Sequence, residues 1–182
     1  MPPLSEPTVA REKLHRRVVT CEGYRRADGL WDIEGHMTDV KTYGFDNDWR
    51  GRVDPGEPLH GMWLRITLDD AYTILAVEAR TEYSPYQVCG NITANYQKLV
   101  GLAIGPGFTQ KVKALMGRTE GCTHLTELLW PMATTAYQTM VAKRRDPDAE
   151  QKPWHINTCH ALAADGPIVK TSWPDYYTGD KE

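Results

Sequence analysis

The chain has 182 residues, of which 41% are hydrophobic and 25% charged, and its formal net charge is -3. This length and composition are typical of one globular domain that needs no disulfides, and the charge excludes a general attraction to nucleic acid or to an anionic membrane. The sequence shows neither the apolar run of a signal peptide nor the roughly 20 apolar residues that span a bilayer, so we expect a cytoplasmic protein with four reduced cysteines.

The chain begins with a proline-rich, basic segment that predicts a flexible lead-in at residues 1–17. A single α+β domain is expected to follow at residues 18–145. Its first element is a β-hairpin, because Asp28-Gly29 supplies the backbone angles of a tight turn between two strand-like runs. Charged residues that alternate along this hairpin, Asp39 among them, indicate a solvent-facing surface.

A second hairpin is predicted after residues 46–58, a stretch dense in Gly, Pro, Asn and Asp that indicates a surface loop. In the following sequence, MWLRITL, hydrophobic residues alternate with others. After the polar turn Asp69-Asp70, the run TILAVEARTEY is expected to pair with it as the returning strand. Two hairpins of this kind predict an antiparallel sheet with one buried face.

The hydrophobic pattern changes from a period of two to that of helices after Cys89. One helix is predicted to end at Leu102, and a second, in FTQKVKALMGR, at Gly117. A third is expected to start near Cys122, and Pro131 should kink it without ending it. The predicted strands all come before the predicted helices. This order indicates an α+β fold, in which helices pack on one face of an antiparallel sheet of two hairpins.

The remainder, residues 146–182, is rich in Pro, Asp and Gly and predicts an irregular C-terminal arm packed on the domain. One short strand is expected in the sequence GPIVKTSW. The three basic residues at 143–145 should complement the dipole of the third helix.

Three potential metal ligands lie at boundaries of the predicted elements. His60 precedes the MWLRITL strand, Cys89 follows the returning strand, and Cys122 opens the third helix. Because one hairpin strand starts beside the end of the other, His60 and Cys89 are expected at the same edge of the sheet, where a helix can deliver Cys122. Two thiolates and an imidazole suit zinc or iron, with a fourth position left for water or substrate.

His124 and Glu127 stand one helical turn apart and are candidates for moving protons, although a solvent-facing pair has the same spacing. A helix turns about 100° per residue, so His124 and Cys122 reach one metal only if Cys122 precedes the regular helix. Cys159 and His160 are adjacent in the C-terminal arm and are further candidates, but their spacing does not require a role.

The order of these features resembles the iron–sulfur cluster assembly scaffolds of the IscU and NifU N-terminal type. The resemblance covers the strand pair MWLRITL and TILAVEA and the helices after it, and it implies His60, Cys89 and Cys122 at the places of the scaffolds' three cysteines. The chain departs from the scaffolds at Met62, where they carry an aspartate, and at Gly121, where they carry a histidine. A histidine ligand suits a mononuclear site better than a transferable cluster.

A second resemblance covers nearly the whole chain. The stretches EGYRRADGLWDIEGHMTD, GCTHLTELLWPMATTAYQT and CHALAADGP are similar to an uncharacterised bacterial domain-of-unknown-function family. That resemblance implies no mechanism.

These features together predict a mononuclear zinc or iron enzyme, a lyase or hydrolase, that acts on a small organic substrate. His60, Cys89 and Cys122 are expected to hold the ion, while His124 or Glu127 moves protons. The alternative is an iron–sulfur cluster or metal carrier that delivers its cargo to a partner protein, and a third hypothesis is a module with a purely structural metal. We expect no nucleic-acid or membrane partner, and a homo-oligomer is left open.

Overall fold

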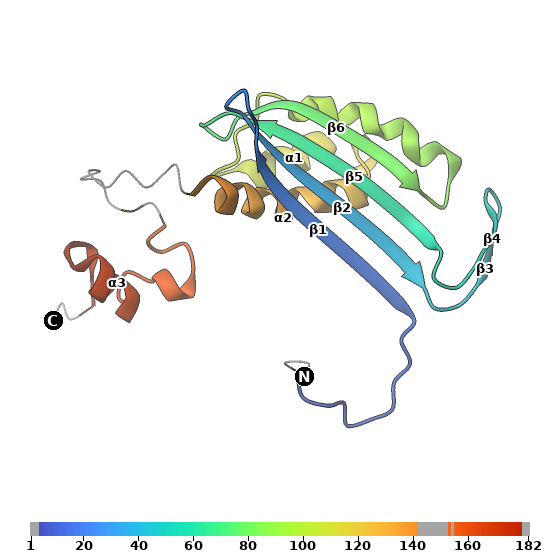
Figure 1. The fold of residues 1–182 in the computed structure, drawn as a ribbon, viewed down its shortest axis with the longest axis horizontal. Helices are drawn as coiled ribbons and strands as arrows, with labels where there is room; N and C mark the ends of the chain where they lie inside the picture. Colours follow the sequence, from blue (N-terminus) through green and yellow to red (C-terminus); the bar gives the residue numbers. More distant parts are fainter. Residues whose placement is uncertain (1–3, 142–152, 154, 180–182) are drawn as a thin grey trace. The chain divides into compact units, whose positions relative to one another are not determined.

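The computed structural model describes residues 4–141, 153 and 155–179 (Figure 1). The chain divides into two compact units, Met1–Ala142 and Lys143–Glu182. No helix of the described residues is long and apolar enough to cross a membrane.

A four-stranded antiparallel sheet forms the centre of the first unit. Its spatial order is β1-β2-β5-β6, and its strands are β1 (His15–Arg25), β2 (Trp31–Lys41), β5 (Pro58–Leu68) and β6 (Ile74–Tyr83). Both predicted hairpins are confirmed, and β2 pairs with β5 to join them. In the first hairpin, Gly29 adopts a φ of 89°, a conformation that glycine reaches without the steric cost of a Cβ atom. Strand β1 starts at His15, within the segment predicted as a lead-in.

The predicted loop at residues 46–58 contains a small hairpin of its own, formed by β3 (Phe45–Asn47) and β4 (Gly51–Val53). The side chain of Asn47 accepts hydrogen bonds from the backbone N–H groups of Trp49 and Arg50. The Gly, Pro, Asn and Asp residues on which the loop prediction rested therefore form the turn of a short β-hairpin. These residue types favour tight turns in loops and in hairpins alike.

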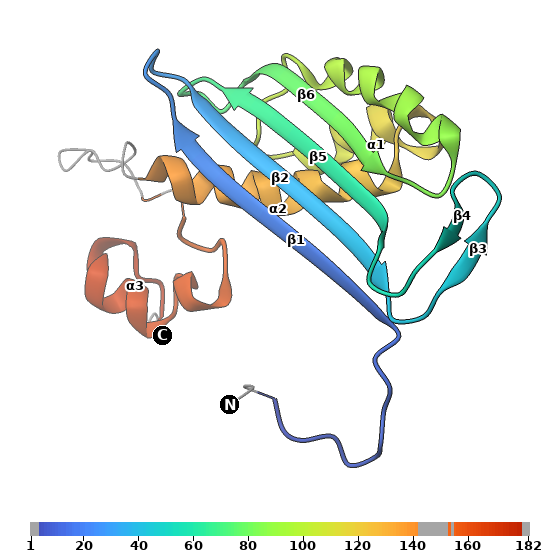
Figure 2. The ribbon, with the colours of Figure 1, turned by 45° about the vertical axis from the view of Figure 1, so that its right-hand side comes forward.

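Helices cover one face of the four-stranded sheet (Figure 2). They are the 3-10 helix η1 (Gln87–Leu99), α1 (Phe108–Met116), the short η2 (Arg118–Glu120) and α2 (Thr123–Met140). The second and third predicted helices are confirmed, and α2 continues through Pro131. The first begins before Cys89 and is of the tighter 3-10 type. The architecture is α+β, as predicted.

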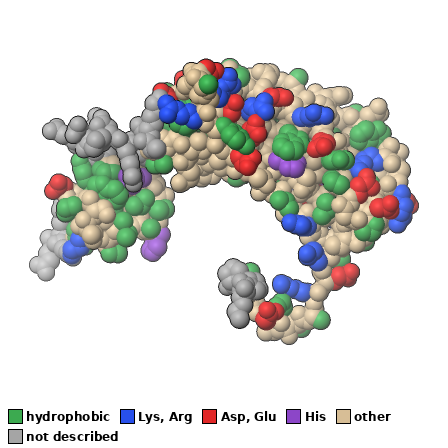
Figure 3. Space-filling model, viewed as in Figure 1, with side chains coloured by type: hydrophobic (Ala, Val, Ile, Leu, Met, Phe, Trp, Pro, Cys, Tyr) green, Lys and Arg blue, Asp and Glu red, His purple; other side chains and the backbone are tan. Residues whose placement is uncertain are grey.

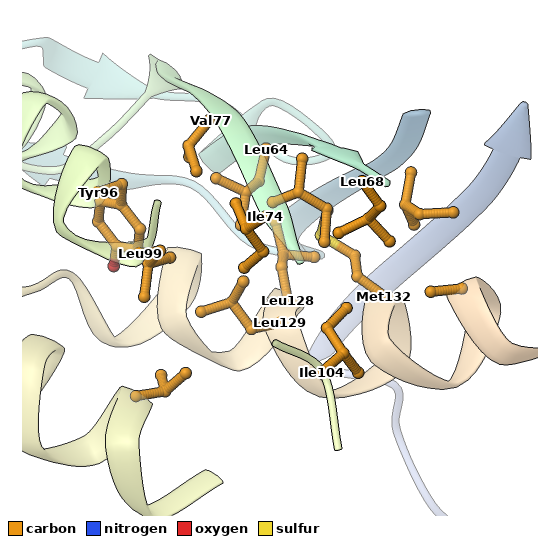
Figure 4. Close-up of a cluster of buried hydrophobic side chains, with 14 of the residues drawn as sticks. Leu64, Leu68, Ile74, Val77, Tyr96, Leu99, Ile104, Leu128, Leu129 and Met132 are labelled. Carbon is orange, nitrogen blue, oxygen red and sulfur yellow. The ribbon is translucent and has the colours of Figure 1, made fainter. Parts of the chain in front are cut away.

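The core lies between the covered face of the sheet and these helices (Figure 4). Alternate strand residues such as Leu64 and Ile74 face Leu128 and Met132 of α2. Gly35 of β2 permits close packing, because a Cβ atom there would lie 2.6 Å from the Sδ atom of Met132. This packing fixes the position of α2 on β1 and β2.

The second unit has its own small core of Ile156, Ala164 and Val169. Its elements are η4 (His160–Leu162), α3 (Pro167–Ser172) and η5 (Pro174–Tyr176). The prediction of a short strand in GPIVKTSW is therefore wrong, since this sequence forms α3. Pro167 stands at the first helical position, where its missing N–H leaves no bond unmade. The basic residues at 143–145 lie outside the described residues.

Candidate metal centre

A row of three polar side chains crosses the covered face near the end of the sheet. In the strand pairing, Asp39 of β2 stands opposite Arg17 of β1 on one side and opposite His60 of β5 on the other. Directly opposite residues point to the same face of a sheet, so the three side chains meet under the helices. The first two turns of α2 bring His124 and Glu127 to this row.

Asp39 is buried, and both of its carboxylate oxygens accept hydrogen bonds. The Oδ1 atom accepts from Nε of Arg17 at 2.8 Å and from Nε2 of His15 at 2.9 Å. The Oδ2 atom accepts from Nη2 of Arg17 at 2.8 Å and from Nδ1 of His60 at 3.0 Å. A bidentate arginine and two imidazoles thus surround one carboxylate.

The charge on Asp39 is determined by a competition between burial and its partners. Burial would raise the pKa of its carboxyl group, but the hydrogen bonds and charge of Arg17, followed by the hydrogen bond from His15 and the charge that His60 would carry, outweigh this effect and lower the pKa to about 2. Asp39 is therefore ionised at neutral pH, and an ionised carboxylate only accepts hydrogen bonds.

The imidazoles of His60 and His124 are neutral at neutral pH, because the pKa of each is lowered from its ordinary value. Burial lowers the pKa of His60, and the positive charge that His124 would carry lowers it further. Burial likewise lowers the pKa of His124, together with the charge of Arg17. A neutral imidazole has a lone pair with which it can bind a metal ion or accept a proton.

Asp39, His60 and His124 form what we call the histidine–aspartate cluster. Each offers a ligand atom, and the three atoms lie within 4.8 Å of one another. The rings of His60 and His124 have centroids 3.9 Å apart, and Nε2 of His124 lies 3.9 Å from Oδ2 of Asp39. In the part of the chain that the structure describes, no other three His, Cys, Asp or Glu side chains meet this distance.

The predicted ligands are only partly brought together. His60 belongs to the cluster, and the Sγ atom of Cys122 lies 3.9 Å from Nδ1 of His124. Cys122 is extended, with φ -91° and ψ 129°, and stands just before α2, so it meets the condition under which it and His124 reach one centre. Cys89 lies in η1 and is not a member of the cluster. A metal role for either cysteine stays a prediction.

The hydroxyl group of Tyr96 connects η1 to the start of α2. It donates a hydrogen bond to the carbonyl oxygen of Cys122 at 2.8 Å and accepts one from the N–H of Cys122 at 3.1 Å. Burial is the main reason that the pKa of Tyr96 is raised to about 12. Tyr96 therefore stays a neutral hydroxyl that fixes the backbone next to the thiol.

The other predicted residues have different surroundings. The Oε2 atom of Glu127 accepts a hydrogen bond from Nη1 of Arg17 at 2.8 Å, so Glu127 extends the polar row towards solvent. Cys159 and His160 belong to the second unit, and their participation in the centre stays a prediction.

Sequence reasoning missed Asp39, Arg17 and His15. Asp39 was expected on a solvent-facing surface, and this expectation is wrong because the residue is buried. The sequence did contain a signal: Asp39 is an even number of positions from Trp31 and Met37, the hydrophobic residues that mark the buried face of β2. An ionisable residue on a hydrophobic face is a candidate for a function.

Residues 15–138 match the model of a family described as "Protein of unknown function (DUF2889)". The matched range contains the whole histidine–aspartate cluster, together with Arg17 and Cys122. No curated protein and no solved structure matches the chain, and nothing in these comparisons supports the likeness to the IscU and NifU scaffolds.

Proposed function

The chain belongs to the DUF2889 family of proteins of unknown function, and we propose that its histidine–aspartate cluster binds a zinc or iron ion. The observation that carries this proposal is the approach of two neutral imidazoles and a buried carboxylate to within 4.8 Å of one another. Imidazole nitrogens are good ligands for zinc and ferrous iron, whereas magnesium and calcium prefer oxygen ligands throughout.

A purely structural ion-pair network is the main competing explanation. Asp39 with Arg17 would suffice for such a network, because the bidentate pair already balances the buried charge. The charge balance does not require His124, which nevertheless stands with its ring against that of His60. Two partly buried neutral imidazoles side by side are better explained by a shared ligand.

The chemistry that we propose is that of a lyase or hydrolase acting on a small organic substrate. A bound zinc or ferrous ion supplies Lewis acidity, which polarises a substrate oxygen or lowers the pKa of a water molecule. His60 and His124 would hold the ion, and Asp39 would keep His60 in place. Glu127, half-exposed at the end of the polar row, is the proposed proton carrier.

Metal analysis of the anaerobically purified full chain tests the proposal. We expect one zinc or iron ion per chain in the wild type and less than a tenth of that in the His60→Ala, His124→Ala double variant. The matched control is His36→Ala, because His36 lies on the opposite face of β2 and stacks on Trp63.

Two results would count against the mononuclear enzyme. A broad visible absorption from a labile cluster would favour the iron–sulfur carrier. Equal metal content in the double variant and the wild type would remove the histidine–aspartate cluster as the binding site.

A further inference from the structure

Strand β1 lies at an open edge of the four-stranded sheet. It pairs with β2 on one side only, so about half of its backbone N–H and C=O groups point to the outer edge. Among the described residues of the first unit, 4–141, no group outside β2 makes a hydrogen bond to these backbone groups. An edge strand of 11 residues with unpaired backbone groups is a template on which another strand can pair.

The opposite edge of the sheet, formed by β6, is partly covered by the chain itself. The N–H of Ile74 donates a hydrogen bond to the carbonyl oxygen of Leu102 at 2.8 Å, and the carbonyl oxygen of Ile74 accepts one from the N–H of Gly101 at 2.8 Å. The side-chain amide of Gln97 in η1 donates to the carbonyl oxygen of Val77. The first unit therefore protects one edge of its sheet and leaves the β1 edge available.

The side chains at the β1 edge are partly apolar and partly charged. Val18 and Val19 are 36% and 45% exposed, and Leu14, just before the strand, is 53% exposed. Charged residues on an open edge usually prevent pairing, and β1 carries several basic residues and one acidic residue, Glu22. Two copies of β1 can therefore pair only in a register that brings Glu22 opposite a basic residue.

An antiparallel pairing of two copies that is centred on Val19 has this register. Residues equally far before and after Val19 then stand opposite each other, so Arg16 of each copy faces Glu22 of the other. Arg16 and Glu22 are exposed and point to the same face of the sheet, because they are an even number of positions apart. Moving the centre by one residue in either direction places an apolar residue opposite Glu22 and loses both ion pairs.

Both members of this ion pair are available in the single chain. In the part of the chain that the structure describes, Arg16 makes no ion pair. The Oε2 atom of Glu22 accepts a hydrogen bond from the hydroxyl group of Tyr24 at 2.8 Å, which leaves Oε1 for Arg16 of the second copy. The same register places Val19 opposite its own copy and Leu14 opposite Tyr24, and apolar pairs of this kind stabilise neighbouring strands.

We propose that the protein forms a two-fold symmetric dimer in which the β1 strands of two copies pair antiparallel about Val19 and join their sheets into one. A second copy fits this edge better than an unrelated strand, because the charges of β1 are complementary to those of the same strand reversed. The dimer also covers the outer side of the polar row, since His15 and Arg17 lie on β1 with side chains that are 39% and 37% exposed.

Size-exclusion chromatography with light scattering on the metal-free full chain tests the dimer over a range of concentrations. We expect the wild type to have twice the 20.6 kDa mass of one chain. Arg16→Glu and Glu22→Arg should each raise the dissociation constant of the dimer about tenfold, because two attractive pairs become two repulsive ones. The double variant should restore the wild-type constant, since it exchanges the charges and keeps the pairing.

The matched control is Arg80→Glu, which reverses the charge of an exposed residue on β6 and should leave the dimer unchanged. A wild type that is monomeric at every concentration would overturn the proposal. A dimer that both single variants leave unchanged would place the interface away from β1. Failure of the double variant to restore the dimer would overturn the register centred on Val19.

Circular dichroism checks that the variants are folded, which we expect because the changed side chains are exposed. If one single variant does not fold, the other single variant and the double variant decide. Because these measurements use metal-free protein, their outcome is independent of the metal-binding function proposed above.

Discussion

Arg17 and Arg65 each hold two carboxylates, and they lie on opposite faces of the same sheet. On the covered face Arg17 holds Asp39 and Glu127, and on the open face Arg65 holds Glu34 at 2.7 Å and Glu78 at 2.9 Å. The side chain of Asp39 is 4% exposed, whereas those of Glu34 and Glu78 are 30% and 71% exposed.

This comparison shows that two ion pairs with similar distances can differ in strength, because one is exposed to water and the other is partly shielded from it. On the face of the first unit seen in Figure 3, acidic and basic side chains lie side by side in contact with water, which screens their interaction. Under α2 the screening is weak, so a charge that loses its partner is costly. We expect Arg17 to matter far more to stability than Arg65.

The largest expected effect is that of Arg17→Met. This change leaves the Asp39 charge buried without its bidentate partner and should lower the free energy of unfolding by about 2–4 kcal/mol, which is less than for a fully buried pair because the Arg17 side chain is 37% exposed. Urea unfolding followed by circular dichroism measures it. A loss no larger than that of Arg65→Met would contradict the comparison.

Acidification should lower the free energy of unfolding because it protonates Asp39, and this effect should lie between those of Arg17→Met and Arg65→Met. The folded pKa of Asp39, about 2, lies below its unfolded value, so its contribution is present above about pH 4 and is lost as the pH falls towards 2. A shift of nearly two pKa units corresponds to about 2 kcal/mol.

Unfolding free energies of the metal-free protein between pH 7 and pH 2 measure this contribution. The acid-dependent loss should be smaller by that amount in Asp39→Asn. The control Glu34→Gln should follow the wild-type curve closely, and a flattened curve for this control as well would show that the effect is not specific to the buried carboxylate.

The smallest expected effect is that of Arg65→Met, about 0.2–1 kcal/mol. Because these charges are exposed, most of the effect should disappear when the same urea titration is repeated in 1 M salt, since the screening length is then only about 3 Å. Persistence of the full effect at high salt would mean that Arg65 contributes by packing and not by charge.

Much of the fold could be predicted because the responsible patterns are local. Alternation in β5, the Asp28-Gly29 turn and the hydrophobic face of α2 each depend on neighbours within a few residues. The wrong prediction of a strand at residues 166–173 also has a local cause. A short apolar run beside proline is compatible with a strand and with the start of a helix equally well.

The candidate centre could be predicted less well because it depends on register. His60 and His124 were singled out as separate candidates, but their pairing arises only once α2 is packed over β2 and β5. Asp39 was assigned to solvent because charges in a strand usually are, and only the β1-β2-β5 register reveals its two partners. No local pattern contains that information.

The polar row also has a consequence for the order of folding. Arg17 and Glu127 are 110 residues apart in sequence, whereas the β1–β2 hairpin joins partners through a turn of a few residues. Contacts across such separations close slowly, so the hairpins should form well before α2 docks and completes the cluster. A ligand that binds only the completed cluster therefore reports on the whole first unit, and by mass action it would protect β1, β2, β5 and α2 together against unfolding.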